Sequence, residues 1–414
     1  MAMQNWAGNL TFGATEVVEP QRIDQLQELV SSSARVGVVG AAHSFNDLAD
    51  TEGVMVSMAG LGEVVEIDST GRTVTAQGGI RYHVLSQALH DAGWALPNLM
   101  SIPHFSVAGA CATGTHGSGD GNQGLASAVR SIELVDGHGE LVRYSRGDDH
   151  FDGVVVNLGA LGIATELTLD VQPTFEISQE LHLDLPTVTA IDDFDEIMAS
   201  AYSVSLFTDW QGDTVNQLWR KHLAHSAPRA AEPYRDATPA DRMLTPSGEP
   251  GDHSMTPQLL RAGPWHQRLP HIDPSFELFA SELQSEYFVS RAHARQALQA
   301  VSDMSDLLAP VIKMAEVRTV AGDELWLSPF HGDTLALHFS WLIDADVSGV
   351  LPALEDGLAP FDPLPHWGKL HTVAPDVIRR GYPRFGDFIE LADRHDPHGR
   401  FRNRHLDLLL TSSH

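Results

Sequence analysis

The chain has 414 residues, about twice the length of a common domain, and its 43% hydrophobic and 20% charged residues are typical of a globular protein. Its 26 basic and 55 acidic residues give a formal net charge of −29, which repels phosphate backbones and anionic lipid head groups. These numbers exclude a single small binding module and a disordered chain, and they argue against nucleic acid or a membrane surface as a partner.

The first 173 residues alternate short apolar runs with glycine-rich turns. The spacing of apolar residues predicts helices at about 23–30 and 82–92. Strands are predicted at 36–39, 54–57, 64–67 and 73–76, and residues 131–144 form a predicted hairpin around an Asp-Gly-His-Gly turn. Because strands and helices do not alternate as a regular βαβ repeat, we expect a mixed α+β fold.

Beyond residue 173, the sequence predicts strands at 203–210 and 334–343 and helical spacing at 291–308. Nine of the 23 prolines lie between Pro228 and Pro274, among polar residues. This pattern predicts a long irregular excursion inside a second domain. We call residues 226–275 the proline-rich excursion.

Cys111 is the single cysteine, so the chain can form no internal disulfide and no metal site built on several cysteines. No apolar run reaches the ~18 residues that a membrane-spanning helix needs, and the first residues lack a signal-peptide pattern. We therefore expect a cytoplasmic protein with no membrane segment and no metal, and with Cys111 buried as packing.

The segment Val-Gly-Val-Val-Gly-Ala-Ala-His-Ser-Phe-Asn at 36–46 is the first candidate for chemistry. A strand that runs into a turn of small residues lets backbone N–H groups approach a diphosphate closely. The segment lacks G-x-G-x-x-G, and no helical pattern follows it directly, which argues against a Rossmann dinucleotide site. Taken alone, it is better explained as a tight turn with a structural histidine.

A second segment of small residues lies at 101–119. Ala and Gly at 108–112 precede the run Gly-Thr-His-Gly at 114–117, and several hydroxyl side chains flank it. Such a chain can wrap a large polar ligand with its own amides. Two such loops within about 120 residues are hard to explain as turns alone.

Together these motifs resemble the vanillyl-alcohol oxidase flavoprotein superfamily: His-Ser-Phe-Asn at 43–46, Ser-Val-Ala-Gly at 106–109 leading to Thr-Gly-Thr-His-Gly-Ser-Gly at 113–119, and Gly-Ala-Leu-Gly at 159–162. Within it, the chain is similar to the bacterial alditol oxidases, which act on xylitol and sorbitol. The likeness extends to residues 5–9, 206–210, 283–287 and 365–369, and covers nearly the whole chain except the proline-rich excursion.

The resemblance implies a two-domain α+β fold of the vanillyl-alcohol oxidase type. The implied parts are an FAD-binding domain (1–173), a substrate-binding cap domain on a mixed or antiparallel sheet (174–376), and a C-terminal segment (377–414) that returns to the FAD-binding domain. The implied reaction oxidises the terminal hydroxyl of an alditol to the aldose and reduces O2 to H2O2. The implied partners are a polyol and O2, and we expect a monomer.

By the same resemblance, His43 carries FAD covalently, through a ring nitrogen bonded to the 8α-methyl carbon of the flavin. A neutral imidazole is a good nucleophile near pH 7, and an electron-withdrawing tether makes the flavin a stronger oxidant. The other residues implied in cofactor binding are Val38, Val39, Gly40, Ala41, Ala42, Ser44, Ser101, Ser106, Gly109, Thr113, Gly114, Thr115, His116, Ile163, Ala164 and His366.

The substrate site is expected in the second domain. Alternate residues of a strand point to one face, which places Glu316 beside Arg318 and His338 beside Ser340. The resemblance implies that Arg318 and Lys369 bind and polarise the reacting hydroxyl, that Glu316, Ser101 and Ser340 orient the polyol, and that His338 is a candidate proton acceptor. Two cations in one pocket would locally reverse the negative charge of the chain.

Other interpretations of these residues stay open. Without a flavin site, Glu316 and Arg318 fit a strand-face ion pair, and His338 fits a structural histidine. Met100 stands where the family usually has a small residue beside the flavin, and Ser340 stands where it usually has threonine. A long Met100 side chain that shields the flavin from oxygen would favour a sugar or aldonolactone dehydrogenase with another acceptor. A third alternative is a non-catalytic sugar-binding protein.

Overall fold

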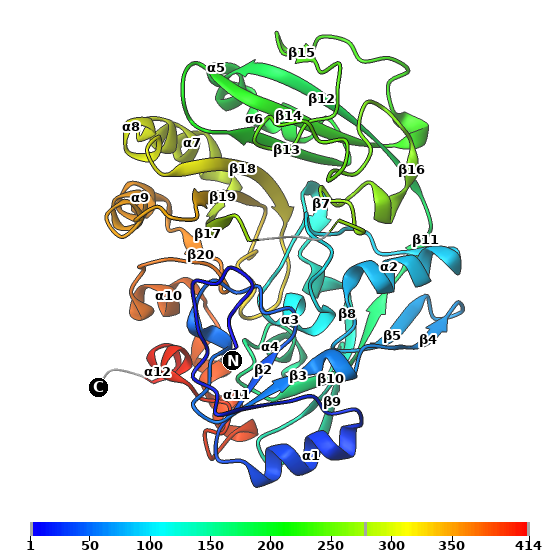
Figure 1. The fold of residues 1–414 in the computed structure, drawn as a ribbon, viewed down its shortest axis with the longest axis vertical. Helices are drawn as coiled ribbons and strands as arrows, with labels where there is room; N and C mark the ends of the chain where they lie inside the picture. The colour runs from blue at the N-terminus through cyan, green and yellow to red at the C-terminus, as the bar shows by residue number, and fades with distance from the viewer. Residues whose placement is uncertain (1–2, 277–279, 412–414) are drawn as a thin grey trace.

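The computed structural model describes residues 3–276 and 280–411. One large, mainly antiparallel sheet fills the upper part of the molecule, and among the described residues three smaller sheets, one of them the two-stranded pair of β6 and β11, lie in the lower part (Figure 1). The C-terminal helices, in orange and red, lie beside the N-terminal strands (Figure 1). The chain therefore starts and ends in the same lower part.

The lower part contains a parallel sheet with the order β1-β3-β2 and an antiparallel sheet with the order β4-β5-β10-β8-β9. Their strands are β1 (Glu16–Val18), β2 (Val36–Val39), β3 (Val54–Ser57), β4 (Val64–Asp68), β5 (Thr73–Gln77), β8 (Val129–Val135), β9 (Leu141–Ser145) and β10 (Ile163–Asp170). The other elements here are α1 (Ile23–Ser32), α2 (Tyr82–Asp91), β6 (Trp94–Ala95), α3 (Val107–Ala112), α4 (Phe151–Val154), β11 (Gln172–Pro173), α10 (Pro375–Gly381), α11 (Phe385–His395) and α12 (Arg404–Leu410).

Among the described residues, the upper sheet has ten strands, with the order β15-β12-β14-β13-β18-β19-β17-β20, while β16 pairs with β12 and β7 with β18. The strands are β7 (Gly119–Gln123), β12 (Glu176–Pro186), β13 (Ser203–Thr208), β14 (Thr214–Leu223), β15 (Thr238–Pro239), β16 (Gly263–Pro264), β17 (Glu282–Ser290), β18 (Ile312–Ala321), β19 (Thr334–Leu342) and β20 (Leu364–Pro365). The helices of the upper part are α5 (Thr187–Asp192), α6 (Phe194–Met198), α7 (Ala294–Ser302), α8 (Ser305–Leu308) and α9 (Val350–Leu358).

Short 3-10 turns connect several of these elements. They are η1 (Asp47–Ala49), η2 (Met58–Gly60), η3 (Leu125–Ala128), η4 (Ala224–Ser226), η5 (Trp265–Gln267), η6 (Arg291–His293) and η7 (Ala359–Phe361). Two of them matter for the site, because η1 follows the loop of His43 and η5 belongs to the proline-rich excursion.

The two-residue period of β17, β18 and β19 gives the sheet one apolar and one polar face. Tyr287, Val317 and Leu337 belong to a buried cluster that also contains apolar residues of α6, α7 and α9. The alternate positions carry polar or charged side chains, among them Glu286, Glu316 and His338. The register places these three directly side by side on adjacent strands. Packing of the apolar face against the helices therefore fixes where the polar row points.

A second buried cluster joins distant parts of the sequence in the lower half. It contains residues of α2 and α3 together with Tyr382, Phe385 and Phe388 from the C-terminal region. Cys111 lies in this cluster, where burial raises the pKa of its thiol to about 12, so the expectation that it is buried packing is confirmed.

Most predicted elements of the sequence are confirmed, including both helices, all four early strands and the hairpin. Two differences stand out. The helical spacing at 291–308 forms three short pieces, η6, α7 and α8, and the segment at 101–119 contains helix α3, whose small residues let it pack closely. The proline-rich excursion is irregular, as expected, and contributes only the short elements β15, β16 and η5.

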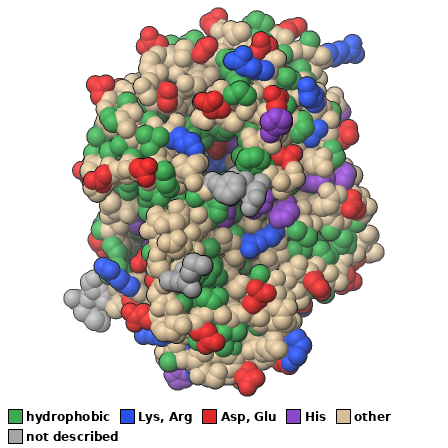
Figure 2. Space-filling model, viewed as in Figure 1, with side chains coloured by type: hydrophobic (Ala, Val, Ile, Leu, Met, Phe, Trp, Pro, Cys, Tyr) green, Lys and Arg blue, Asp and Glu red, His purple; other side chains and the backbone are tan. Residues whose placement is uncertain are grey.

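The described residues include no helix long and apolar enough to cross a bilayer and no group of three His, Cys, Asp or Glu side chains placed to hold a metal ion. Acidic side chains are spread over the face that Figure 2 shows, without a continuous patch of Lys and Arg.

Candidate functional site

A cavity of about 500 Å³ lies between the two parts of the molecule, and both parts line it. The lower part contributes the loop after β2, the segment at 100–115 and the turn between α4 and β10. The upper part contributes β17, β18 and β19, the loop after β20, and residues of the proline-rich excursion. All predicted site residues line this cavity except Gly114 and Ser340.

The loop after β2 exposes its backbone to this cavity. The amides of residues 41–44 donate no hydrogen bond to any described residue, and Ala42 has a positive φ of 54°. A Cβ at Gly40 would lie 1.9 Å from Oγ of Ser106, so only glycine allows the strand to approach this close. The result is a cradle of free N–H groups beside small side chains, which suits an anionic group such as a diphosphate.

His43 projects from this loop into the cavity. Its ring stacks on Trp6 at 4.4 Å between centroids and contacts Phe105 at the same separation, but it makes no hydrogen bond to another described residue. Burial, with smaller contributions from His104 and Arg81, lowers the pKa of His43 to about 3. The imidazole is therefore neutral near pH 7 and keeps a free lone pair.

His366 presents a second free group in the cavity. Its Nδ1 accepts the amide N–H of Gly368 at 3.0 Å, which places the proton of the neutral ring on Nε2. Burial and the neighbouring Lys369 keep the pKa of His366 well below its ordinary value. Among described residues Nε2 has no acceptor, so it is a donor available to a bound group.

His116 lines the cavity, but its ring nitrogens contact protein atoms and leave neither free for a cofactor. Its Nε2 lies 3.1 Å from Oε1 of Glu286, and its Nδ1 lies 2.8 Å from the carbonyl oxygen of Gly117. Both ring nitrogens are thus engaged with the protein. Gly114 lies outside the cavity lining, between Thr113 and Thr115, and its φ of +68° turns the backbone between them.

The residues that line the cavity around the loop after β2 fit FAD. The amides of residues 41–44 can receive the diphosphate, and the apolar walls around His43 suit an aromatic ring system. His43 and His366 each direct an unpaired ring atom into the same space. No Rossmann-type helix follows β2, as the sequence predicts.

Glu286 lies at the centre of the cavity wall that the upper part forms, and the sequence alone did not single it out. Its carboxylate, 1% exposed, is 2.8 Å from Nη2 of Arg318 and 2.7 Å from Nζ of Lys369. The backbone N–H of His366 also donates to the carbonyl oxygen of Glu286, so β17 positions the loop that carries Lys369. The alternation of Glu282, Gln284 and Glu286 along one strand was the signal that could have identified this polar row.

This carboxylate changes the expected electrostatics. Burial alone would raise the pKa of Glu286, but Lys369, His116 and Arg318 hold it well below its ordinary value. Burial lowers the pKa of Lys369, and Glu286 opposes that shift. The expected local excess of positive charge is therefore wrong, because one buried carboxylate pairs with both cations.

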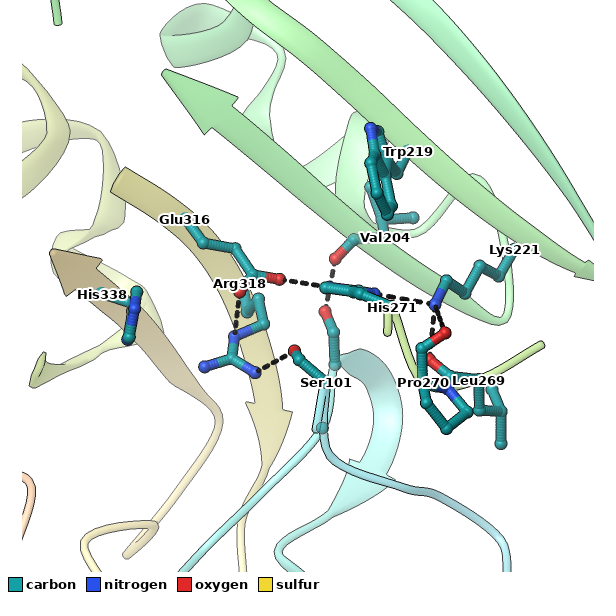
Figure 3. Close-up of polar contacts among 12 residues, drawn as sticks. Ser101, Val204, Trp219, Lys221, Leu269, Pro270, His271, Glu316, Arg318 and His338 are labelled. Atoms are coloured by element: carbon teal, nitrogen blue, oxygen red, sulfur yellow. Dashed lines mark hydrogen bonds and ion pairs between the residues drawn. The ribbon is translucent and has the colours of Figure 1, made fainter. Parts of the chain in front are cut away.

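Arg318 and Glu316 lie side by side on β18, as predicted. Nε of Arg318 is 3.6 Å from Oε2 of Glu316 and has no hydrogen-bond partner among described residues, while Nη1 donates to Oγ of Ser101 at 3.4 Å (Figure 3). Nε of Arg318 is itself buried, so the atom that the site offers is Oε2 of Glu316, which has no closer partner among described residues. A substrate hydroxyl can donate to this oxygen.

His338 is the middle member of a polar chain. Lys369 Nζ lies 2.7 Å from its Nδ1, and its Nε2 lies 3.2 Å from Oγ of Ser340. Ser340 is fully buried behind His338 and donates to Oε1 of Glu282 at 2.9 Å, and Glu282 pairs with Lys313. Ser340 thus contacts His338 and Glu282 and does not reach the cavity.

Two family models match the chain: an FAD binding domain over residues 14–145 and D-arabinono-1,4-lactone oxidase over residues 266–409. The chain is 46% identical to an alditol oxidase from a Streptomyces species, with 99% of each chain covered. It is 29% identical to an L-gulono-1,4-lactone dehydrogenase from Mycobacterium tuberculosis, with 96% of each chain covered.

Among solved structures, a variant of cholesterol oxidase from Brevibacterium sterolicum matches with a TM-score of 0.80 at 15% identity, covering 99% of this chain and 97% of that chain. A solvent-stable cholesterol oxidase matches with the same TM-score at 17% identity and the same coverage. The fold is thus the two-domain fold of the vanillyl-alcohol oxidase type, and the class is that of FAD-binding oxidoreductases. Within this class, the chain belongs to the alditol oxidase family.

Proposed function

We propose that the protein oxidises the terminal hydroxyl of alditols such as xylitol and sorbitol to the aldose, with O2 reduced to H2O2. The observation that carries this proposal is the convergence of Arg318, Lys369, Glu286 and His338 on a cavity whose opposite wall fits FAD. Neutral hydroxyl-rich substrates are bound by such mixed donors and acceptors. The identity to an alditol oxidase over the full chain supports it.

FAD is proposed to be attached covalently through His43. The neutral ring, its free lone pair and its place beside the amide cradle support this attachment. The diphosphate and ribityl chain would lie along residues 38–44, 106–109 and 113–116, with Ile163 and Ala164 at the adenine side and His366 at the flavin ring. When bound, FAD supplies the acceptor for hydride and the route by which electrons reach O2.

The chain's own residues prepare the hydroxyl for oxidation. The guanidinium of Arg318 and Nζ of Lys369 donate to its oxygen and favour the alkoxide character that develops as hydride leaves carbon. Glu286 is a poor proton acceptor because its pKa is so low, and it holds the two cations in place. The hydroxyl proton passes to Nζ of Lys369 as that ammonium gives one of its own protons to Nδ1 of His338, 2.7 Å away, while Nε2–H stays on Ser340. Glu316 and Ser101 orient the rest of the polyol.

Anaerobic flavin reduction across a polyol panel tests this function. Xylitol or sorbitol should bleach the flavin absorbance, and readmission of air should restore it with release of H2O2. A purified protein without any bound flavin would contradict the proposal, and so would a flavin that no polyol bleaches.

A flavin-dependent sugar or aldonolactone dehydrogenase is the second candidate. Met100 favours it, because this buried side chain lines the cavity and can shield the flavin from O2. The 29% identity to a lactone dehydrogenase is compatible with it. Dye reduction without peroxide would favour this candidate, whereas one H2O2 for each polyol consumed would exclude it.

The domain division at 173 and 376 is part of the same proposal. One buried cluster joins residues before 178 with the C-terminal helices, but it also includes Trp265, Leu269, Leu325, Trp326, Leu327 and Trp367 of the proposed cap domain. The buried residues of a second cluster all lie between 185 and 358, which supports a separate core for the cap domain. We propose a cytoplasmic monomer; size-exclusion chromatography with light scattering and fractionation of the source cells test these two points.

A further inference from the structure

A buried chain of polar groups runs from β14 through the proline-rich excursion to β18 (Figure 3). We call the cavity wall formed by β17, β18, β19 and the loop after β20 the substrate wall. It consists of Lys221 on β14, His271 in the excursion and Glu316 on β18. Their exposed fractions are 1%, 6% and 4%. Buried charged groups of this kind are costly unless each is paired, so their arrangement is specific.

Lys221 anchors the excursion. Its Nζ donates to the carbonyl oxygen of Leu269, to that of Pro270 at 3.3 Å, and to Nδ1 of His271 at 2.9 Å. Burial lowers the pKa of Lys221 to about 7. In its protonated form the ammonium has three N–H donors, and here each has an acceptor. The lysine thus fixes both the position of the segment at 269–271 and the acceptor role of Nδ1.

His271 in turn holds Glu316 in place through a hydrogen bond. Because Nδ1 accepts from Lys221, the neutral ring carries its proton on Nε2, which lies 2.8 Å from Oε1 of Glu316. The ring packs against Trp219 and Phe207 at centroid separations of 5.0 and 5.5 Å. Its backbone N–H donates to the carbonyl oxygen of Ser101 at 2.9 Å.

The two oxygens of Glu316 therefore have different surroundings. Oε1 is taken by His271, whereas the nearest polar atom to Oε2 among described residues is Nε of Arg318, at 3.6 Å. Rotation of the carboxylate would break the bond to His271. The free oxygen Oε2 is in this way held at the cavity wall, where a substrate hydroxyl can donate to it.

We infer that His271 is a positioning residue for the polyol chain: it holds Glu316 in the orientation that accepts a substrate hydroxyl, and Lys221 supports the tautomer and the position of the ring. This inference rests on the proposed function. It assigns a specificity role to the end of the proline-rich excursion.

The test is a set of variants of the flavin-loaded enzyme, assayed with xylitol. His271→Leu is expected to raise KM roughly tenfold and to change kcat by less than about threefold, because a binding contact is lost and not the chemistry. His271→Gln, whose amide can still donate to Glu316, should restore KM to within about threefold of the wild type. His266→Leu is the matched control: this buried histidine of the excursion bonds Gln87, lies outside the cavity, and should leave KM unchanged.

A double-mutant cycle separates positioning from general packing. If His271 acts through Glu316, His271→Leu added to Glu316→Gln should change KM by less than about twofold. Additive effects of the two substitutions would overturn the inference while leaving the proposed function standing. A wild-type flavin that no polyol reduces would instead remove the proposed function and this inference with it.

Nitrogen NMR of isotope-labelled histidine rings gives a readout that does not depend on activity. The His271 signals, assigned by their loss in His271→Gln, should report an unprotonated Nδ1 and a protonated Nε2. Lys221→Met should shift the Nδ1 signal, because that atom loses its donor, while Nε2 keeps its proton against the carboxylate of Glu316. A proton on Nδ1 in the wild type would overturn the inference whatever the kinetics.

Discussion

The carboxylate of Glu286 and the ammonium of Lys369 are 2.7 Å apart in a site from which solvent is almost excluded. The other carboxylate oxygen lies 2.8 Å from Arg318, so one buried anion fixes both cations of the substrate wall. Preorganised charges act on a developing alkoxide without first having to reorient. We therefore expect the pair to serve the proposed oxidation as well as the stability of the sheet.

Glu286→Gln is expected to lower kcat by about 100-fold, with a smaller change in KM, because Arg318 and Lys369 lose their common anchor. The substitution should also cost about 3 kcal/mol of unfolding free energy, since it leaves two buried cations underpaired. Stopped-flow flavin reduction and urea unfolding measure the two effects.

Glu180→Gln is the matched control for Glu286. Glu180 is also 1% exposed and pairs with Arg220 and His222, but it lies outside the main cavity. It should lose stability and keep the rate of flavin reduction. Equal loss of kcat in both variants would contradict a specific role for Glu286.

His43→Ala should abolish covalent attachment of FAD while the protein stays folded. Among the described aromatic rings, the His43 ring contacts Trp6 and Phe105, and its removal leaves the amide cradle unchanged. Denaturing gels viewed by flavin fluorescence, and the mass of the intact chain, measure attachment. His104→Ala, a change at a neighbouring histidine that does not line the cavity, should keep the flavin attached. Covalent flavin on the His43→Ala chain would refute the assignment.

Met100→Ala tests whether this side chain limits oxygen access. Met100 is 2% exposed and lines the cavity, so truncation opens space inside the site. The reoxidation rate of the reduced flavin in air should rise roughly tenfold, with little change in its reduction by xylitol. Met58→Ala removes another buried methionine of the same cavity, next to the loop after β2, and should leave reoxidation unchanged. A rate unchanged in Met100→Ala would mean that oxygen reaches the flavin by another path.

The sequence predicted those parts of the site that lie within one segment. The loop after β2, the pair Glu316–Arg318 and the pair His338–Ser340 follow from local patterns, because a strand alternates its faces and small residues form a close turn. The structure adds that Ser340 does not line the cavity itself and contacts two residues that do, His338 and Glu282.

Glu286, Lys221 and His271 could not be assigned in that way. Glu286 becomes central only because the register of β17, β19 and β18 sets it beside His338 and Glu316. His271 contacts Glu316 across 45 residues of sequence, and Lys221 contacts His271 across 50. Such contacts depend on strand pairing and on the path of an irregular segment, which no local periodicity encodes.

The last prediction concerns stability and pH. Asp323 follows β18 and accepts hydrogen bonds from Ser127, Ser328 and the amide of Leu325. Burial raises the pKa of its carboxyl from 3.8 to about 6. Between these two pH values the folded state holds the Asp323 proton more tightly than the unfolded state does. The contribution of this proton to the unfolding free energy is therefore complete below pH 3.8 and is lost as the pH rises through 6.

Asp323→Asn should remove this dependence, because the amide is neutral and the serine hydroxyls can accept its N–H groups. The stability of the variant relative to the wild type should therefore increase between pH 4 and pH 7, by at most about 3 kcal/mol. Urea unfolding of both proteins across this range measures the difference. A difference that stays constant with pH would mean that Asp323 is as ionised in the folded chain as in the unfolded one.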